Sequence, residues 1–352
     1  MNIKKIFSFA ASIISFAICY FHLSFNSIAS ENDSKFFSND KGVLSLMYHR
    51  FNENKYPSTN IRMNIFDEQM KMIKSLGYKF YDPKLFEEEF SISKKEKKIL
   101  ISIDDGFSSF YKEAWPYLKK NNIPFILFVS TEPVGKNGYM TWEQIIEIEK
   151  SPLGTIGHHS HTHEYLIDFS NDDFINDIET ASKIFKEKLG YIPSIFSYPF
   201  GEYSKFMKDY ISENFKIAFG QHSGVIDLNK DKFELPRFPI NEKYGDLKRF
   251  KSVINYYPLE YKSIKPEEKK INAYSNPPEL VVEFFDEQEN LNNITCYSND
   301  GGNWKKTNSI FKKNIMKIKF EDSFLPRRGR INCSLNDKGK WRWFGTQFTV
   351  RN

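Results

Sequence analysis

The stretch Ile101-Ser102-Ile103-Asp104-Asp105-Gly106 ends an apolar run with two adjacent carboxylates and a glycine. A short apolar run bounded by turn residues predicts a buried β-strand, and the glycine lets the chain turn sharply after it. Neighbouring side chains point in different directions, so one carboxylate could bind a metal ion while the other faces a substrate. The competing interpretation is that Asp-Asp-Gly only turns the chain at the end of a strand.

Similar apolar runs recur on both sides of this stretch and alternate with amphipathic patterns. The predicted strands or strand ends are residues 43–47, 99–103, 125–129, 155–157 and 195–198. Apolar residues at helical spacing predict helices around residues 66–76 and 175–189, the second ending at Gly190. Alternating strands and helices indicate a parallel sheet, either a barrel or a doubly wound sheet. In such folds the reactive side chains lie beyond the C-terminal ends of the strands.

The character of the sequence changes in its last quarter. Residues 258–278 are rich in Tyr, Lys, Glu and Pro and are interpreted as a linker. The strands predicted beyond it are residues 279–285, 293–298, 314–320, 329–335 and 341–350. Asn299-Asp300-Gly301-Gly302 and Asn336-Asp337-Lys338-Gly339 are strong turn signals between strands. We therefore expect a catalytic domain over residues 42–257 and a small all-β sandwich over residues 279–352.

Trp304, Trp341 and Trp343 suggest two alternative roles within the C-terminal module. Aromatic faces pack well on sugar rings, so the tryptophans could form a sugar-binding platform. The alternative, which the sequence favours, is that they fill the core of a small sandwich.

The N-terminus has the features of a secretory signal peptide over residues 1–30. Lys4 and Lys5 precede an apolar run, and Ser27-Ile28-Ala29 provides small residues for cleavage. An uncleaved membrane anchor is the alternative, since the apolar run approaches the length of a membrane span. We expect cleavage, export to a periplasm or to the cell surface and medium, and no stable membrane span afterwards. The two cysteines of the C-terminal module could then form a disulfide, although their spacing does not show that they meet.

The composition excludes one class of partner. The formal net charge of the 352 residues is +5, and the 50 Lys and Arg are mixed along the chain with 45 Asp and Glu. This distribution gives no clustered basic surface for a nucleic acid. The sequence carries no indication of an oligomeric state.

Four of the seven histidines fall within Gly157-His158-His159-Ser160-His161-Thr162-His163. The segment follows a predicted strand, where a parallel sheet places its chemistry. His159 and His163 are four residues apart, so one helical turn would align their imidazoles on one face. Two histidines and a carboxylate, with an open position, are typical of a catalytic metal site. A solvated histidine-rich loop is the alternative.

Three further motifs end predicted strands or lie in turns. Tyr198-Pro199-Phe200-Gly201 is a tight turn that could aim a backbone N–H at a ligand. Leu235-Pro236-Arg237-Phe238-Pro239 holds an arginine between two prolines, and Leu44 to His49 is an apolar run ending in a histidine. Each has a structural alternative, namely a plain turn, a surface loop, and a capping or core histidine. Their shared position near strand ends favours one common site.

Together these motifs resemble the polysaccharide deacetylases (carbohydrate esterase family 4, the NodB homology domain). Ile103-Asp104-Asp105-Gly106 and His159-Ser160-His161-Thr162-His163 are similar to the first two family motifs, and Tyr198-Pro199-Phe200-Gly201 to the third. The strand ending in His49 is similar to a leucine–histidine motif that most members carry near the end of the domain. Here it comes first, as in the permuted branch that includes poly-N-acetylglucosamine deacetylases. The resemblance covers about residues 42–250.

The resemblance implies a fold and a set of roles. The fold is α/β, a distorted (β/α) barrel of the NodB type, followed here by the small all-β sandwich. The implied ligands of a divalent metal ion, zinc by preference, are Asp105, His159 and His163. Asp104 matches the general base, His49 the general acid, and the backbone N–H of Phe200 a donor to the oxyanion.

Two positions depart from the family pattern. Phe200 replaces the usual tyrosine, which matters little if only its N–H acts. Ser197 stands where many members have an arginine that orients the base, and Arg237 is assigned that orienting role instead. His158 and His161 match no family role.

The implied activity is metal-dependent removal of acetyl groups from N-acetylglucosamine-type residues of a cell-envelope or extracellular polysaccharide. The products would be acetate and a free amino sugar. The permuted motif order favours a poly-N-acetylglucosamine-like polymer as the acetylated substrate. Two alternatives stay open: a catalytically inactive, carbohydrate-binding, wall-associated protein, and an esterase acting on O-acetylated glycans.

Overall fold

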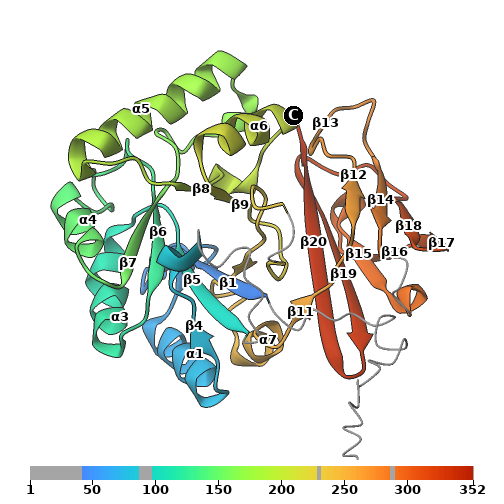
Figure 1. Ribbon diagram of the computed structural model, residues 1–352, viewed down its shortest axis with the longest axis horizontal. Helices are drawn as coiled ribbons and strands as arrows, with labels where there is room; N and C mark the ends of the chain where they lie inside the picture. Colours follow the sequence, from blue (N-terminus) through green and yellow to red (C-terminus); the bar gives the residue numbers. More distant parts are fainter. Residues whose placement is uncertain (1–41, 87–96, 228–230, 286–289, 352) are drawn as a thin grey trace, which may run out of the picture.

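A computed structural model describes residues 42–86, 97–227, 231–285 and 290–351. It contains two bodies side by side, a curled sheet covered by helices and a pair of smaller sheets near the C-terminus (Figure 1). The predicted signal peptide, residues 1–30, lies outside the described residues. Within the described part of the chain, no helix is both long and apolar enough to cross a membrane.

The N-terminal body is built on a parallel sheet curled into a half-barrel (Figure 1). Its strand order is β10-β1-β5-β6-β7-β8-β9, with β4 also paired to β5. The strands are β1 (Val43–Tyr48), β4 (Lys79–Phe80), β5 (Lys98–Ile103), β6 (Phe125–Val129), β7 (Gly154–His158), β8 (Ile195–Ser197), β9 (Ile217–Phe219) and β10 (Phe238–Pro239). Strands β1 and β6 are buried along their whole length, which is why they read as continuous apolar runs. The predicted α/β barrel with parallel strands is confirmed.

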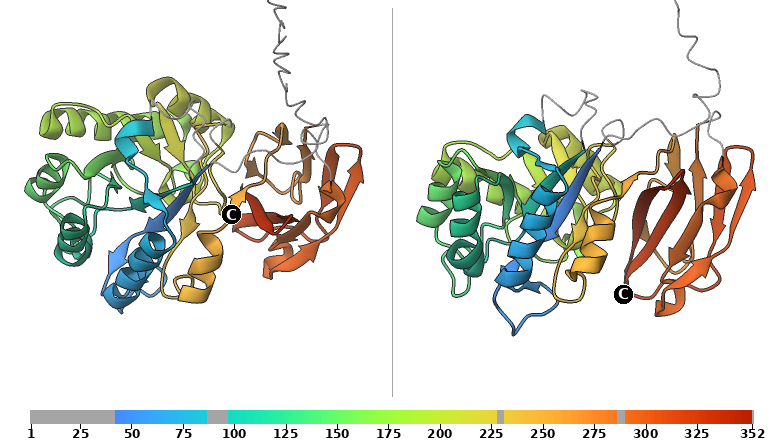
Figure 2. Two further views of the ribbon diagram at one scale, coloured as in Figure 1. Left: turned by 60° about the horizontal axis from the view of Figure 1, so that its bottom comes forward. Right: turned by 90° about the horizontal axis from the view of Figure 1, so that it is seen from below.

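Helices cover the outer face of this sheet (Figures 1 and 2). They are α1 (Met63–Ser75), α3 (Trp115–Asn121), α4 (Trp142–Glu149), α5 (Asn171–Leu189), α6 (Lys205–Asn214) and α7 (Leu247–Val253). Helix α5 begins after Ser170, whose hydroxyl accepts from the Asp173 N–H, and ends at Gly190 in the left-handed conformation, as the sequence predicts. The shorter elements are β2 (Arg50–Phe51), β3 (Asn60–Ile61), η2 (Pro83–Leu85), η3 (Phe110–Ala114), η4 (Leu166–Asp168) and η5 (Pro199–Gly201).

The C-terminal body consists of two sheets beside the half-barrel (Figure 2). One has the order β11-β20-β19-β15-β16 with β13 paired to β20, and the other the order β12-β14-β18-β17. The elements are β11 (Tyr257–Pro258), β12 (Ser263–Lys265), β13 (Lys270–Ile271), β14 (Glu279–Glu283), η6 (Leu291–Asn293), β15 (Thr295–Ser298), η7 (Asp300–Gly302), β16 (Lys305–Thr307), β17 (Ser309–Lys312), β18 (Ile315–Lys319), β19 (Arg327–Asp337) and β20 (Lys340–Val350). One apolar cluster from both sheets forms the core. Strands β12 and β13 fall inside residues 258–278, the predicted linker; the division of the chain into domains stays a prediction.

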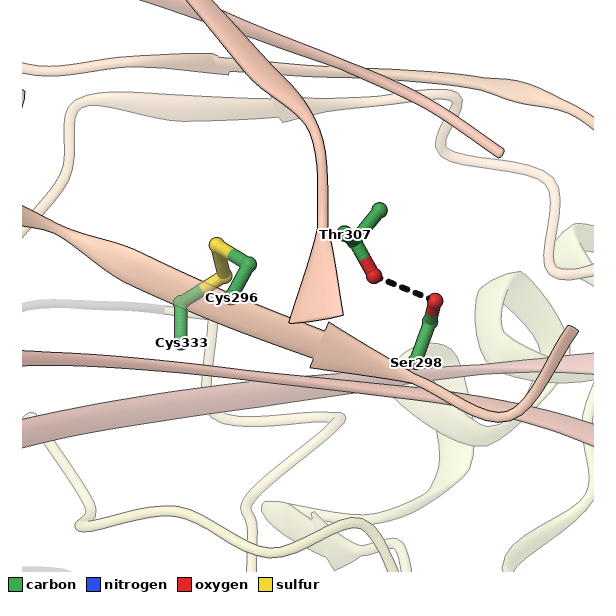
Figure 3. Close-up of a disulfide and its surroundings, with 4 residues drawn as sticks. All are labelled: Cys296, Ser298, Thr307 and Cys333. Atoms are coloured by element: carbon green, nitrogen blue, oxygen red, sulfur yellow. Dashed lines mark hydrogen bonds between the residues drawn. A yellow bond between two sulfur atoms is a disulfide. The ribbon is translucent and has the colours of Figure 1, made fainter. Parts of the chain in front are cut away.

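A disulfide joins Cys296 of β15 to Cys333 of β19, which lie directly opposite each other in the antiparallel register. Both cysteines are buried in the core of the C-terminal body. Figure 3 shows the bond next to a hydrogen bond between Ser298 and Thr307, so β15 is tied to strands on both of its sides.

The tryptophans of this body do not fill its core, and the expectation that they do is wrong. Trp304 and Trp341 are each 48% exposed, and Trp343 packs on the half-barrel, stacking on Tyr256 with ring centres 4.9 Å apart. For Trp341 and Trp343 the reason is strand alternation, because Phe344 and Phe348 of β20 face the core while the odd-numbered side chains face away from it.

Replacing Cys296 and Cys333 together by serine is expected to lower the free energy of unfolding by about 2–5 kcal/mol, since the open chain gains freedom in the unfolded state. Chemical denaturation measures the change. A reductant should shift the unfolding midpoint of the wild-type protein towards that of the double variant and leave the variant unmoved. Equal midpoints for both proteins without reductant would contradict the assignment of the disulfide as a stabilising link.

Candidate active site

The predicted site residues gather where neighbouring parallel strands end. Asp104 and Asp105 follow β5, His159 follows β7, and the turn at Phe200 follows β8. Because β5, β6, β7 and β8 are consecutive in the sheet, their C-terminal ends share one rim of the half-barrel.

Asp104 and Arg237 form a buried, two-pronged ion pair at this rim. The Arg237 NH1 and NH2 groups donate to the two carboxylate oxygens of Asp104 over 2.6 and 2.9 Å, and both side chains are fully buried. The remaining guanidinium donors reach Gly220 O, Ser102 Oγ and Ser197 Oγ. All five N–H groups of the guanidinium therefore have acceptors, which a buried arginine requires.

The position of Arg237 follows from how the half-barrel is completed. Leu235 bridges Phe219 of β9, and Phe238 pairs with Leu46 of β1, so the segment between them spans the two edge strands. Its arginine then points towards β5. This contact supports the orienting role predicted for Arg237, and Ser197 contributes an acceptor where the family arginine would stand.

Charge rather than burial controls the Asp104 carboxyl. Burial by itself raises the pKa of a carboxyl group, but the guanidinium of Arg237, with smaller contributions from the imidazoles of His159 and His49, outweighs it. The pKa of Asp104 therefore lies below its ordinary value, and the group is held as a carboxylate.

Asp105, His159 and His163 converge as a possible metal-binding set. Their ligand atoms all lie within 4.8 Å of one another, with Asp105 Oδ1 3.3 Å from His159 Nε2 and 2.9 Å from His163 Nε2. Asp105 Oδ1 and His159 Nε2 are buried and make no hydrogen bond. His159 uses Nδ1 to donate to Ser197 O over 2.7 Å, which leaves Nε2 as the free ligand atom. The donor set fits a divalent ion such as zinc.

The segment that carries the histidines is a loop, so the helical turn expected for His159 and His163 is wrong. Ser160 and His163 both have a positive φ, and these two left-handed residues fold the loop so that the imidazole centres lie 4.9 Å apart. Asp177 of α5 holds the loop, accepting from the His161 and Thr162 N–H groups over 2.8 and 3.0 Å.

The other two histidines of the cluster have structural surroundings. His158 is buried against Phe185, Phe196 and Phe215, and burial lowers its pKa to about 3. His161 contacts the Thr131 hydroxyl through Nδ1 at 2.8 Å. Neither belongs to the metal-binding set, in agreement with their lack of a family role.

His49 and Phe200 lie on opposite sides of the carboxylates. His49 Nε2 is 3.9 Å from Asp104 Oδ2; burial lowers the pKa of this imidazole, and the nearby carboxylates partly oppose the shift. Phe200 has a φ of 58°, uncommon for a residue with a side chain, and its ring stacks on Tyr165 at 4.1 Å. A positive φ at the third residue, after a proline, is typical of a type II turn, and the Gly201 N–H closes this turn by donating to Tyr198 O over 2.8 Å.

A cleft of about 570 Å³ opens over these residues. His49, Asp105, His163 and Phe200 line it from the half-barrel. The opposite wall belongs to the C-terminal body and includes Trp304, Arg328, Arg330 and Asn332. Both bodies therefore border the same space.

Comparison with known proteins agrees with this geometry. A sequence model described as polysaccharide deacetylase matches residues 91–214. A Bacillus subtilis protein named putative polysaccharide deacetylase YxkH is 28% identical over 162 residues, covering 46% of this chain and 57% of that protein. A Staphylococcus aureus poly-beta-1,6-N-acetyl-D-glucosamine N-deacetylase is 23% identical over 236 residues, covering 58% of this chain and 80% of that protein.

Over residues 91–214 the chain is thus similar to the polysaccharide deacetylase family. It spans a little more than half the length of the Bacillus relative. The solved structure of IcaB from Ammonifex degensii is 26% identical with a TM-score of 0.54, covering 62% of this chain and 99% of that one. A Streptococcus pyogenes deacetylase, PplD in complex with acetate, has a TM-score of 0.55 at 20% identity, covers 60% of this chain and 98% of that one, and shares the fold.

Two residues that position the candidate site are not predicted from the sequence. Asp177 lies on the buried face of α5, and its only signal is a carboxylate among the apolar positions of an amphipathic helix. Glu202 follows the Phe200 turn, is 2% exposed, and pairs with Arg327 and Arg328 of β19 at 2.7 and 3.0 Å. No local pattern predicts that contact, since the partners are more than 120 residues away.

Replacing Arg237 by glutamine is expected to destabilise the protein by about 3–5 kcal/mol, because it leaves the Asp104 carboxylate buried without its counter-charge. The free energy of unfolding measured by denaturant titration tests this. The double variant Arg237→Gln/Asp104→Asn should recover part of the loss, as both charges are then absent. A single variant as stable as the wild type would rule out a structural dependence on the pair.

Proposed function

We propose that this chain is a metal-dependent N-deacetylase of N-acetylglucosamine-type residues in a polysaccharide. The observation that carries the proposal is the juxtaposition of the buried Asp104–Arg237 pair with the set Asp105, His159 and His163. Asp105 and His163 of this set line the cleft. A general base beside a ligand set with an open position is what hydrolysis of an amide needs. The match of residues 91–214 to the polysaccharide deacetylase model supports the same reaction.

The metal would be held by Asp105, His159 and His163, with zinc as the proposed ion because of the histidine-rich donor set. When bound, it supplies Lewis acidity that activates water and polarises the acetyl carbonyl. Asp104, kept ionised by Arg237, accepts the proton of the attacking water. The bond that breaks is the acetamide C–N bond.

His49 and Phe200 complete the reaction. His49 donates a proton to the departing amine, which is otherwise a poor leaving group. The Phe200 N–H donates to the oxygen on which negative charge develops. Such an interaction typically lowers the activation free energy by about 2.7–4 kcal/mol. Acetate and a free amino sugar result, so atoms and protons balance with one water consumed.

The proposed substrate and location rest on separate observations. A poly-N-acetylglucosamine-type polymer is supported by the named activity of the Staphylococcus relative and by the motif order that begins with His49. Export to a periplasm or the cell surface is supported by the disulfide between Cys296 and Cys333, since such bonds persist in oxidising compartments.

Acetate release from N-acetylglucosamine oligomers by the purified protein tests the activity and its metal dependence. We expect release that a chelator abolishes and added zinc restores, because the buried ligand atoms have no other partners. Release from O-acetylated glycans alone would instead identify an esterase. Sugar binding without any release, in protein loaded with metal, would identify an inactive binding protein.

Replacing Asp104 by asparagine is expected to lower kcat by about 10²–10⁴-fold while bound metal is retained, because the general base is lost but the ligand set is not. Acetate release and metal content are measured on the same sample. Asp172→Asn, an exposed aspartate on α5, is the matched control and should behave as wild type. Unchanged turnover in Asp104→Asn would remove Asp104 from the role of base.

A further inference from the structure

The wall of the cleft opposite the metal-binding set is formed by one face of strand β19. Gly329, Ile331 and Cys333 are buried on the core side, and the residues between them alternate to the other side. Arg328, Arg330 and Asn332 therefore project into the cleft, where Trp304 lies with a largely exposed indole. The C-terminal body thus presents two guanidinium groups to the space beside the catalytic rim.

The charges that line this cleft are unbalanced. Its described lining includes three arginines, Arg249, Arg328 and Arg330, and a single carboxylate, Asp105, which belongs to the metal-binding set. Arg328 is neutralised by Glu202 at 3.0 Å. For the other two, no carboxylate oxygen of the described residues lies within 4.0 Å of the guanidinium.

Arg249 and Arg330 are held in place by neutral groups instead. Arg249 donates through NH1 to the carbonyls of Tyr244 and Pro239, and Arg330 donates through Nε to Gln347 Oε1 over 3.2 Å. Arg249 and Arg330 line the same cleft together with Tyr244, Arg249 from helix α7 of the half-barrel and Arg330 from strand β19 of the C-terminal body. The Arg249 guanidinium lies 5.1 Å from the centre of the Tyr244 ring. Among the described residues, the two terminal amino groups of Arg330 have no hydrogen-bond acceptor, so they are available to a ligand.

Burial acts against both positive charges. It lowers the pKa of Arg330, helped by the neighbouring charge of Arg328, and it lowers the pKa of Arg249. A guanidinium stays charged at neutral pH regardless, so the cleft keeps two partly desolvated cations. A planar anion that accepts two hydrogen bonds is the ligand that such groups bind best.

We propose that Arg249 and Arg330 form an anion subsite that binds a carboxylate or phosphate group on the saccharide next to the sugar that loses its acetyl group. The proposal rests on the deacetylase function but changes the proposed substrate, because an anionic, N-acetylated glycan replaces the uncharged poly-N-acetylglucosamine-type polymer. A neutral homopolymer would leave both cations facing uncharged groups. The exposed face of Trp304 is positioned to pack on a sugar ring along the same wall.

The test compares kcat/KM for acetate release from three N-acetylated oligosaccharides of equal length, one neutral, one with a carboxylate and one with a phosphate. The wild-type protein should prefer at least one anionic oligosaccharide by about tenfold or more. Arg330→Gln should remove about tenfold of kcat/KM on that substrate, mainly through KM, and change the neutral substrate less than about twofold. High salt should reduce the preference.

Matched variants separate the subsite from general effects. Arg249→Gln should act like Arg330→Gln, whereas Arg62→Gln, an exposed arginine outside the cleft lining, should change no rate. Unfolding midpoints show that each variant is folded. A preference for the carboxylate or for the phosphate identifies the natural anion, and equal preference for both still supports the subsite. Equal losses on neutral and anionic substrates, or no wild-type preference, would overturn it.

Binding calorimetry with the same oligosaccharides keeps this proposal distinct from the proposed function. If no substrate releases acetate, the deacetylase function fails. Salt-sensitive binding of an anionic oligosaccharide that Arg330→Gln weakens about tenfold would still establish the subsite. Equal binding of all three oligosaccharides by wild type and variant would refute it whatever the activity.

Discussion

The ion pair between Asp104 and Arg237 is the contact on which the rest of the site depends. A carboxylate without solvent access is very costly unless a counter-charge meets it, and here the guanidinium does so with two parallel hydrogen bonds. The arginine comes from the segment that spans the two edge strands of the half-barrel. The segment that joins β9 to β1 in the half-barrel therefore also supplies the charge that keeps Asp104 ionised.

The sequence predicts those parts of the molecule whose structure is determined by residues close to them in the chain. Apolar runs that end in polar residues located β1, β5, β6, β7 and β8, and with them the rim that holds Asp104, Asp105 and His159. The helix end at Gly190 and the turn at Phe200 also follow from residues within a few positions. A strand end is encoded by its own side chains, which is why the candidate site could be located before its geometry was known.

The parts that escaped prediction depend on distant partners. The loop from His159 to His163 is shaped by Asp177, and Glu202 is buried only because β19 supplies two arginines. The prediction that the tryptophans fill the core is wrong because the alternation along a strand shows which side chains share a face of the sheet. It does not show whether that face is covered by the core, by another domain or by solvent. Strand β19 shows the result, with one face in the core of the C-terminal body and the other in the cleft.

The disulfide has a consequence for the cleft as well as for the core. Cys333 lies on the same strand as Arg328 and Arg330, and its bond to Cys296 fixes that strand to its neighbour. Thiol oxidation is thus an assembly step for one wall of the cleft. In a reducing compartment, a newly made chain lacks the disulfide that holds this wall. The bond forms only after the chain reaches an oxidising compartment.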